Sequence, residues 1–425
     1  MNAGLVCIVG LLIMSLIGIP ICYAIGLGSL FALLMSSNLP TIIIPQRLFT
    51  GIDSTALLAI PFFVLAGNLM GKGITEKILN FSNAMIGQKK GSLGIVTVIA
   101  SAIFAAISGS GVATVSAIGG ITIPAMKDEG YPASFATSIA AISSTLGPLI
   151  PPSIFLIVYG NATETSVGKL FGAAMIPGIL FALALAVYAY FYAKKKNLPT
   201  RPAVSRKEKL RITIDSIWAL LMPVIILVGI FGGIFTATEA AAVSALYAFI
   251  VGVFIYRSMK WKDLIPVLSA SAISSAALLM LTGLSNASSW IIATSGLPNL
   301  VVEAMRSAIS SPVVLLLVLN LMLLVVGMVI EANAAIVMLV PLILPLLKSF
   351  GISPVTFGVV MAFNLCLGLV TPPVGACVLL STSIGKTRLG ETMKVIVLPL
   401  LIGIAVLLLT TYVKPLTLLV PSLMK

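Results

Sequence analysis

Two proline pairs interrupt long apolar stretches of this sequence, in "LGPLIPPSI" (146–154) and "LGLVTPPVG" (367–375). Proline lacks a backbone N–H and disfavours helix in the residue before it. Main-chain oxygens around Thr145–Gly147 and Gly368–Thr371 are therefore left without helical donors, and each following half-helix begins with free N–H groups. Such oxygens can replace the water shell of a small cation, and such N–H groups can face an anion.

Two further stretches carry polar groups inside apolar surroundings. In "AISGSGVATVS" (106–116), the small residues Ser108–Gly111 allow a tight turn with accessible carbonyls and two hydroxyls, although packing of small residues between helices is an alternative. In "GMVIEANAA" (327–335), Glu331 is an ionisable residue in an apolar segment, which indicates function. Glu331 either binds a cation or braces its hairpin, and Asn333 offers an oxygen beside it.

The composition excludes a soluble protein. Of the 425 residues, 59% are hydrophobic and 9% are charged, and the mean hydropathy is +1.19, whereas soluble domains carry about 25% charged residues. The net charge of +13 lies largely in short loops, so it indicates membrane orientation and no nucleic-acid partner. The sequence contains no histidine and no CxxC pair. We therefore expect an all-α polytopic protein embedded in a lipid bilayer, without catalytic residues and without a metal other than a coupling ion.

The two proline frames are related by a constant offset of 221 residues, which also relates Pro124 to Pro345. Chance is the alternative, but matched glycines and prolines over more than a hundred positions favour an internal repeat. We expect one repeat over 1–193 and the other over 212–425. The matched residues are Gly147, Pro151 and Pro152 in the first frame and Gly368, Pro372 and Pro373 in the second.

The basic segment 194–211 is predicted to be a cytoplasmic linker. Counting crossings from it gives the first repeat a re-entrant hairpin at about 92–126 and a broken helix at 132–158. The second repeat has its hairpin at about 312–348 and its broken helix at 354–380, in the opposite orientation. Inverted repeats with matched broken helices are typical of secondary transporters.

About ten crossings are expected besides the two hairpins. The shorter segments 40–57, 262–277, 74–87 and 297–309 are predicted to be amphipathic helices along the membrane interface. In "FTATEAAAV", either Thr236 or Thr238 is expected to cap a helix. Glu239 would then lie in its first turn, where the helix dipole favours a carboxylate, and we favour this role over one in transport.

Five motifs together resemble the large membrane subunit of tripartite ATP-independent periplasmic (TRAP) transporters, over nearly the whole chain. The resemblance implies an elevator-type, ion-transporter-like fold in the inner membrane of a bacterium, in an unfused form. The motifs are "AIPFFVLAGNLM" (59–70), "AAISGSGVATVSAIGGITIPAM" (105–126), "LGPLIPPS" (146–153), "FTATEAAAV" (235–243) and "NLCLGLVTPPVG" (364–375).

The resemblance also implies sodium-coupled import of an organic acid such as sialic acid or a C4-dicarboxylate. The partners would be a small four-helix membrane subunit and a periplasmic substrate-binding protein, and sodium would be the coupling ion with no other cofactor. One sodium site would combine Ser108, Gly109, Ser110 and Gly111 with Thr145 and Gly147; the other would combine Gly327, Glu331 and Asn333 with Gly368, Val370 and Thr371. The substrate would lie between the tips, near Ser110, Ser153, Asn333, Thr371 and Pro372.

Two alternatives remain open. A self-sufficient sodium–dicarboxylate symporter would need no binding protein. A membrane scaffold without transport activity would tolerate alanine at Ser108, Ser110, Thr371 and Glu331.

Overall fold

The computed structural model describes residues 2–35, 40–87, 91–200 and 205–424. These residues form helices and connecting turns, with no β-strand among them. By length and composition, seven of the described helices are apolar and long enough to cross a membrane. The predicted all-α class is therefore confirmed.

The first half of the chain contains a helix hairpin and an interrupted helix. Its helices are α1 (Ala3–Leu16), α2 (Ile21–Met35), α3 (Ile43–Ile52), α4 (Ala59–Gly71), α5 (Ile74–Ile86), α6 (Ser92–Ser108), α7 (Gly111–Thr114), the π-helical η1 (Val115–Gly119), α8 (Gly120–Asp128), α9 (Ala133–Ser144), α10 (Ile154–Thr163) and α11 (Val167–Lys195).

The second half also contains a helix hairpin followed by an interrupted helix. Its helices are α12 (Arg206–Phe231), α13 (Ala237–Ile250), the π-helical η2 (Val251–Ile255), α14 (Trp261–Thr294), α15 (Leu297–Ala308), α16 (Pro312–Val329), α17 (Ala332–Ser349), α18 (Pro354–Gly368), α19 (Ala376–Gly385), α20 (Leu389–Tyr412) and α21 (Pro415–Leu423).

Both predicted hairpins and both predicted broken helices are present. The first hairpin is α6 with α7, η1 and α8, and the second is α16 with α17. The broken helices are the pairs α9/α10 and α18/α19, and each proline pair lies in the non-helical link between its two half-helices, with a cis bond between the prolines.

The prediction of a separate interfacial helix at 262–277 is wrong. The segment belongs to α14, one continuous helix of 34 residues, which is about 51 Å long at 1.5 Å per residue. The sequence that follows Ser275 is "AALLMLT", which consists mainly of strong helix formers, so nothing ends the helix there.

Helix also extends into both ends of the predicted linker 194–211. α11 continues to Lys195, and α12 begins at Arg206, where the Ser205 hydroxyl accepts the N–H of Glu208 at 3.2 Å. Lysine and arginine favour helix, so charge alone does not end one. Both ends of the predicted linker are therefore helical, and its residues 201–204 lie outside the described part of the chain.

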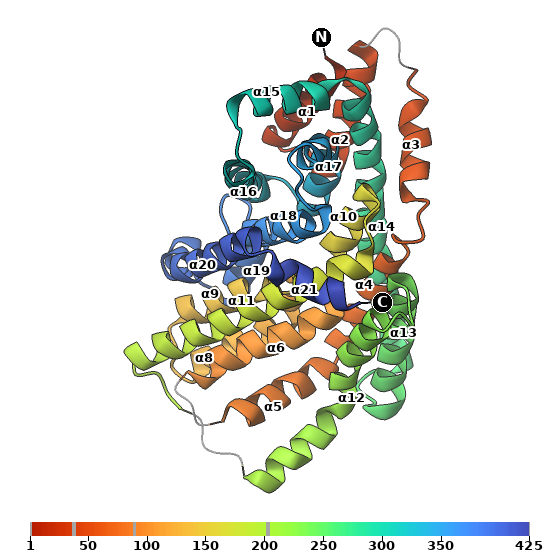
Figure 1. The fold of residues 1–425 in the computed structure, drawn as a ribbon. Helices are drawn as coiled ribbons and strands as arrows, with labels where there is room; N and C mark the ends of the chain where they lie inside the picture. Colours follow the sequence, from red (N-terminus) through yellow and green to blue (C-terminus); the bar gives the residue numbers. More distant parts are fainter. Residues whose placement is uncertain (1, 36–39, 88–90, 201–204, 425) are drawn as a thin grey trace.

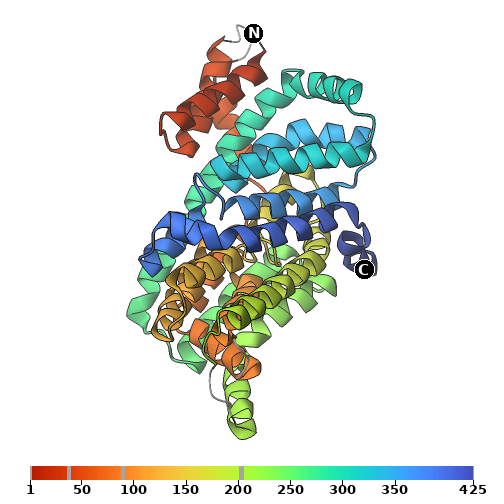
Figure 2. The same ribbon diagram turned by 90° about the vertical axis from the view of Figure 1, so that its left-hand side faces the viewer.

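The helices pack as two groups. In one, α14 packs on α1–α4, α13 packs on α4, and α12 packs on α5. In the other, α18 packs on α16 and α20, and α9 packs on α6, α19 and α20, while α11 covers α6, α18 and α20. Figure 1 shows α3, α14 and α13 along one edge, with α16, α18 and α20 on the opposite side; Figure 2 shows the turned view. The hairpins belong to the second group and contact the first through α6 and α17.

Thr236, one of the two predicted caps, is the N-cap of α13, and Glu239 lies in the first turn. The Thr236 hydroxyl accepts the N–H of Glu239 at 3.2 Å, and the Glu239 carboxylate accepts the N–H of Thr236 at 2.8 Å. This reciprocal pair satisfies two N–H groups that the helix itself leaves unbonded.

Replacing Thr236 with valine should lower the free energy of unfolding by about 1 kcal/mol, because the cap oxygen is lost. The measurement is unfolding of the purified protein in detergent. Thr50→Val is the control, since the Thr50 hydroxyl donates only to carbonyls of its own helix. Equal stability of the two variants would contradict the capping role.

Candidate functional site

The tip of the first hairpin lies against the first interrupted helix. Gly109 ends α6 in a left-handed conformation (φ 61°), which glycine adopts without steric cost. A β-carbon on Gly147 would lie 2.5 Å from the carbonyl oxygen of Ser110, and one on Gly109 would lie 2.7 Å from that of Pro152. The absence of both side chains therefore lets the two backbones touch.

The second hairpin meets the second interrupted helix in the same way. A β-carbon on Gly368 would lie 2.7 Å from the Cα atom of Gly327. The N–H of Val374 donates to the carbonyl oxygen of Met328 at 3.2 Å, so the link also bonds directly to the hairpin. The second tip and the second break are therefore in direct backbone contact.

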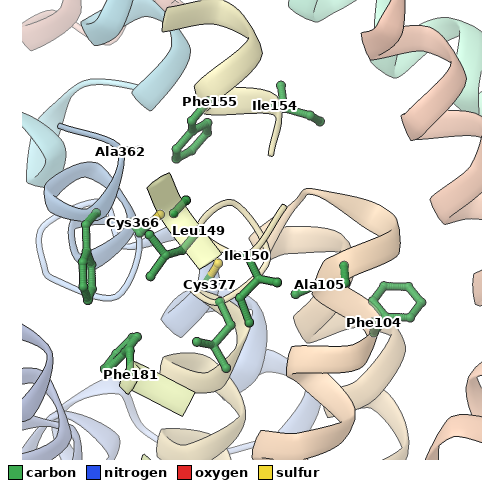
Figure 3. Close-up of a cluster of buried hydrophobic side chains, with 14 of the residues drawn as sticks. Phe104, Ala105, Leu149, Ile150, Ile154, Phe155, Phe181, Ala362, Cys366 and Cys377 are labelled. Atoms are coloured by element: carbon green, nitrogen blue, oxygen red, sulfur yellow. The ribbon is translucent and has the colours of Figure 1, made fainter. Parts of the chain in front are cut away.

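Each hairpin tip thus crosses its interrupted helix at close range, and these two tip–break crossings form one cluster. A β-carbon on Gly111, in the first tip, would lie 3.1 Å from Sγ of Cys377 and 3.2 Å from Cδ1 of Leu369, both beside the second break. Across the same centre, α10 packs on α17 and α19 packs on α9. Figure 3 shows Leu149 of the first break near Cys366 and Cys377. Segments more than 200 residues apart in sequence thus share one buried centre.

Several main-chain oxygens in the breaks have no donor. Within the described part of the chain, no N–H or side-chain donor bonds to the carbonyl oxygens of Thr145 and Gly147 in the first break, or to those of Val370 and Thr371 in the second. The carbonyl of Gly368 differs, because it accepts the N–H of Thr371 at 3.1 Å. Unbonded oxygens in a buried region are costly unless a ligand or water satisfies them.

The hydroxyls of the site are held by local bonds. Those of Thr145 and Thr371 each donate to a carbonyl of the preceding helical turn at 2.7 Å, which leaves their acceptor sites available. The hydroxyl of Ser153 donates to the carbonyl of Pro148 and caps α10, accepting an N–H at 3.3 Å. Ser110 caps α7 in a similar way. Pro372 lies in the link between α18 and α19.

Ser108 connects the first tip to the other group of helices. A β-carbon on Gly67 of α4 would lie 3.1 Å from Cα of Ser108, so α4 passes directly against the tip. The Ser108 hydroxyl lies 3.3 Å from that of Thr114, which donates to the carbonyl of Ser110 at 2.7 Å. The tip is thus braced from both sides.

Glu331 braces the second tip. It is the N-cap of α17: one carboxylate oxygen accepts the N–H of Ala334 at 3.0 Å, and the other accepts the side-chain amide of Asn333 at 2.8 Å. The bracing alternative is therefore present in the structure. The side-chain oxygen of Asn333 is buried and has no hydrogen-bond partner among the described residues, which leaves it free for a ligand.

Comparison with known proteins identifies the family. Residues 8–416 match the family model described as "Tripartite ATP-independent periplasmic transporter, DctM component". The chain belongs to this family. It is a large permease subunit of TRAP transporters.

Named relatives of the permease differ in their substrates. It is 38% identical to the sialic acid TRAP transporter large permease protein SiaM of Vibrio cholerae (96% of this chain, 95% of that protein) and to the C4-dicarboxylate TRAP transporter large permease protein DctM of Pseudomonas aeruginosa (94% of each). It is also 38% identical to the isethionate TRAP transporter permease protein DctMQ of Oleidesulfovibrio alaskensis, covering 93% of this chain but only 63% of that relative.

The fold is also that of a solved membrane transporter. The crystal structure of the Alcanivorax borkumensis YdaH transporter, described as having an unusual topology, matches with a TM-score of 0.58 at 17% identity, over 88% of each chain. At this identity the likeness concerns the fold alone.

Sequence reasoning missed a polar cluster behind the second crossing. The amide of Asn364 in α18 donates to the side-chain oxygen of Asn320 in α16 at 2.7 Å, and the amide of Asn320 donates to the hydroxyl of Thr411 in α20 at 3.2 Å. All three residues are buried. Two asparagines in otherwise apolar helices were the available signal, because buried amides in membranes commonly join helices.

A second missed contact joins the two halves of the permease. The ammonium of Lys127, at the end of the first hairpin, donates to the carbonyl of Gly385 at the end of α19 at 2.9 Å. Nearby, the hydroxyls of Thr137 in α9 and Thr392 in α20 are 2.8 Å apart. These bonds connect elements of both crossings into one body.

Replacing Gly147 with alanine should lower the free energy of unfolding by about 1–3 kcal/mol, because the new methyl group overlaps the carbonyl of Ser110. Unfolding in detergent measures the change. Gly120→Ala is the matched control, since a β-carbon on Gly120 meets nothing within 4 Å and its φ is −55°. The control should be neutral or slightly stabilising. A Gly147 variant as stable as the control would show that the tip and the break are not in contact.

Proposed function

We propose that this permease imports an organic acid together with sodium ions, by an elevator movement, and that a periplasmic binding protein delivers the acid. The observation that carries the proposal is the pair of crossings at one buried centre, each with main-chain oxygens that lack donors. Bare carbonyl oxygens at the break of a helix are suitable ligands for sodium. Sodium is the proposed coupling ion, with no further cofactor and no catalytic reaction.

One sodium ion would bind where the first tip meets the first break. The oxygens of Thr145 and Gly147 lack donors there, and the hydroxyls of Ser108 and Ser110 lie at the adjacent tip. The second ion would bind at the equivalent place, near Val370, Thr371 and the tip that carries Asn333. In this arrangement Glu331 holds the tip and is no direct ligand.

The organic acid would lie between the two tips. α10 and α19 both begin at the shared centre, and free N–H groups at helix starts favour a carboxylate. The unpaired side-chain oxygen of Asn333 would accept a hydroxyl or amide of the substrate. Because the relatives are named for different acids, we propose sialic acids and C4-dicarboxylates as the two candidate substrate classes.

An elevator movement needs one rigid body that carries both crossings. The bonds from Lys127 to Gly385 and between Thr137 and Thr392 support such a body, since they link the two halves of the chain. The helices that would remain still are α1–α5 and α12–α15. In this proposal the repeats are 1–193 and 212–425, in opposite orientations, and 194–211 faces the cytoplasm of a bacterium across its inner membrane.

Uptake into proteoliposomes tests sodium coupling. The permease is reconstituted with its small four-helix subunit and loaded binding protein, and uptake of labelled organic acids is measured under a sodium or a potassium gradient. We expect uptake only with sodium. Equal uptake in potassium would refute sodium coupling, and uptake of free acid without the binding protein would favour the self-sufficient symporter.

Replacing Thr371 with valine should raise the half-saturating sodium concentration about tenfold, which corresponds to about 1.4 kcal/mol. Thr382→Val is the matched control, because the buried hydroxyl of Thr382 also donates to a carbonyl of its own helix but lies outside the break. Identical sodium dependence of both variants would place Thr371 outside the ion site. Full activity after alanine replacement at Ser108, Ser110, Thr371 and Glu331 would favour the scaffold alternative.

A further inference from the structure

The beginning of α12 projects from the body of the permease. Figures 1 and 2 show its first turns extending past the neighbouring helices at the lower end of the molecule. Leu210 and Ile214 point outward there, with exposed fractions of 62% and 60%. They lie four residues apart, on one face of the helix, and continue into the exposed Trp218 one turn later. An apolar face that begins beside basic residues is typical of a helix entering a membrane at its polar surface.

A pocket of about 740 Å³ opens beside this face, between α12 and α5. Lys207 and Arg211 of α12 line it, one helical turn apart, together with Leu210 and Ile214. Two cations at this spacing can bind one phosphate group together, and the aliphatic side chains offer a surface for hydrocarbon. The pocket therefore presents cationic and apolar groups side by side.

Two of the other charged side chains that line the pocket pair with each other. The ammonium of Lys77 pairs with the carboxylate of Asp215 at 2.5 Å and lies over the ring of Tyr256, 5.3 Å from its centroid. This pair holds α5 to α12. Within the residues that the structure describes, neither Lys207 nor Arg211 has a carboxylate within 4.0 Å. Their charges are thus available to an external anion.

The lining also contains a carboxylate that would repel a bound anion. Glu208 lies in the first turn of α12, where the helix dipole stabilises it. Counting Lys77, Lys207 and Arg211 against Glu208 and Asp215 gives the lining a net charge of +1. Lys207 and Arg211 therefore make the pocket favour an anion, and the carboxylate of Glu208 weakens that preference.

We propose that this pocket binds the headgroup of an anionic phospholipid from the membrane leaflet on that side. The phosphate would bridge Lys207 and Arg211, and an acyl chain would run along Leu210, Ile214 and Trp218 into the bilayer. Charge complementarity favours phosphatidylglycerol over zwitterionic lipids. The exposed apolar path favours a lipid over a free phosphate, which would gain nothing from it.

Lipid titration of the delipidated permease tests the proposal. The protein in detergent is titrated with phosphatidylglycerol or phosphatidylcholine, and bound lipid is counted by native mass spectrometry. We expect wild type to prefer phosphatidylglycerol, and Lys207→Gln/Arg211→Gln to weaken that binding about tenfold without changing phosphatidylcholine binding. Glu208→Gln should strengthen phosphatidylglycerol binding, because it removes the opposing charge.

The matched control is Lys194→Gln/Lys195→Gln, which removes two charges at the end of α11, outside the pocket. It should change phosphatidylglycerol binding less than twofold. The exchange Lys207→Arg/Arg211→Lys should retain binding, which separates loss of charge from misfolding. No preference for phosphatidylglycerol in wild type, or equal loss in the control, would overturn the proposal. The measurement requires no transport, so its outcome is independent of the proposed function.

Discussion

A peptide group that lacks a hydrogen bond inside a membrane is expensive, and this permease contains such groups at its centre. Each broken helix exposes carbonyl oxygens that neither lipid nor the helix itself can satisfy. The surrounding structure is arranged around them: the two hairpin tips and the four half-helices α9, α10, α18 and α19 pack beside these oxygens. Even the large aromatic residues nearby, such as Phe181 and Phe363, are fully buried. Protein surrounds the non-helical backbone of the first break, whereas Pro373 and Val374 of the second break are exposed.

Close approach of backbones is the means by which this centre is assembled. Gly147 and Gly368 are matched by the internal repeat, and each lies where a side chain would separate a tip from a break. Polar side chains then fix the surrounding helices. Glu331 and Asn333 hold one tip, and the Asn320–Asn364–Thr411 cluster holds the hairpin to its broken helix. Removing either the glycine contacts or the polar side-chain contacts would change the position of the carbonyl oxygens in the breaks.

The proposed site is built largely from main-chain atoms, so the sequence gives little information about the substrate. Carbonyl oxygens are present in every residue, and their position depends on the path of the backbone. TRAP permeases named for sialic acid, C4-dicarboxylates and isethionate are about equally similar to this chain. Side chains that face the proposed substrate, such as Asn333, are few by comparison.

The sequence by itself determined the elements of this protein. The apolar composition required membrane helices. The adjacent prolines Pro151–Pro152 and Pro372–Pro373 indicated breaks, because each pair removes two donors and disfavours helix in the preceding residue. Thr236 and Glu239 determined a cap through their spacing alone. These are local effects, so a single sequence suffices to predict them.

Tertiary structure decided where these elements meet. Sequence patterns do not report that Asn364 faces Asn320, that Lys127 reaches Gly385, or that Gly67 lies against Ser108. The sequence pattern also predicted a separate helix at 262–277, although this segment is part of the continuous helix α14. The physical reason is that such contacts depend on how far apart helices lie and how they rotate. Packing of the whole chain determines those quantities.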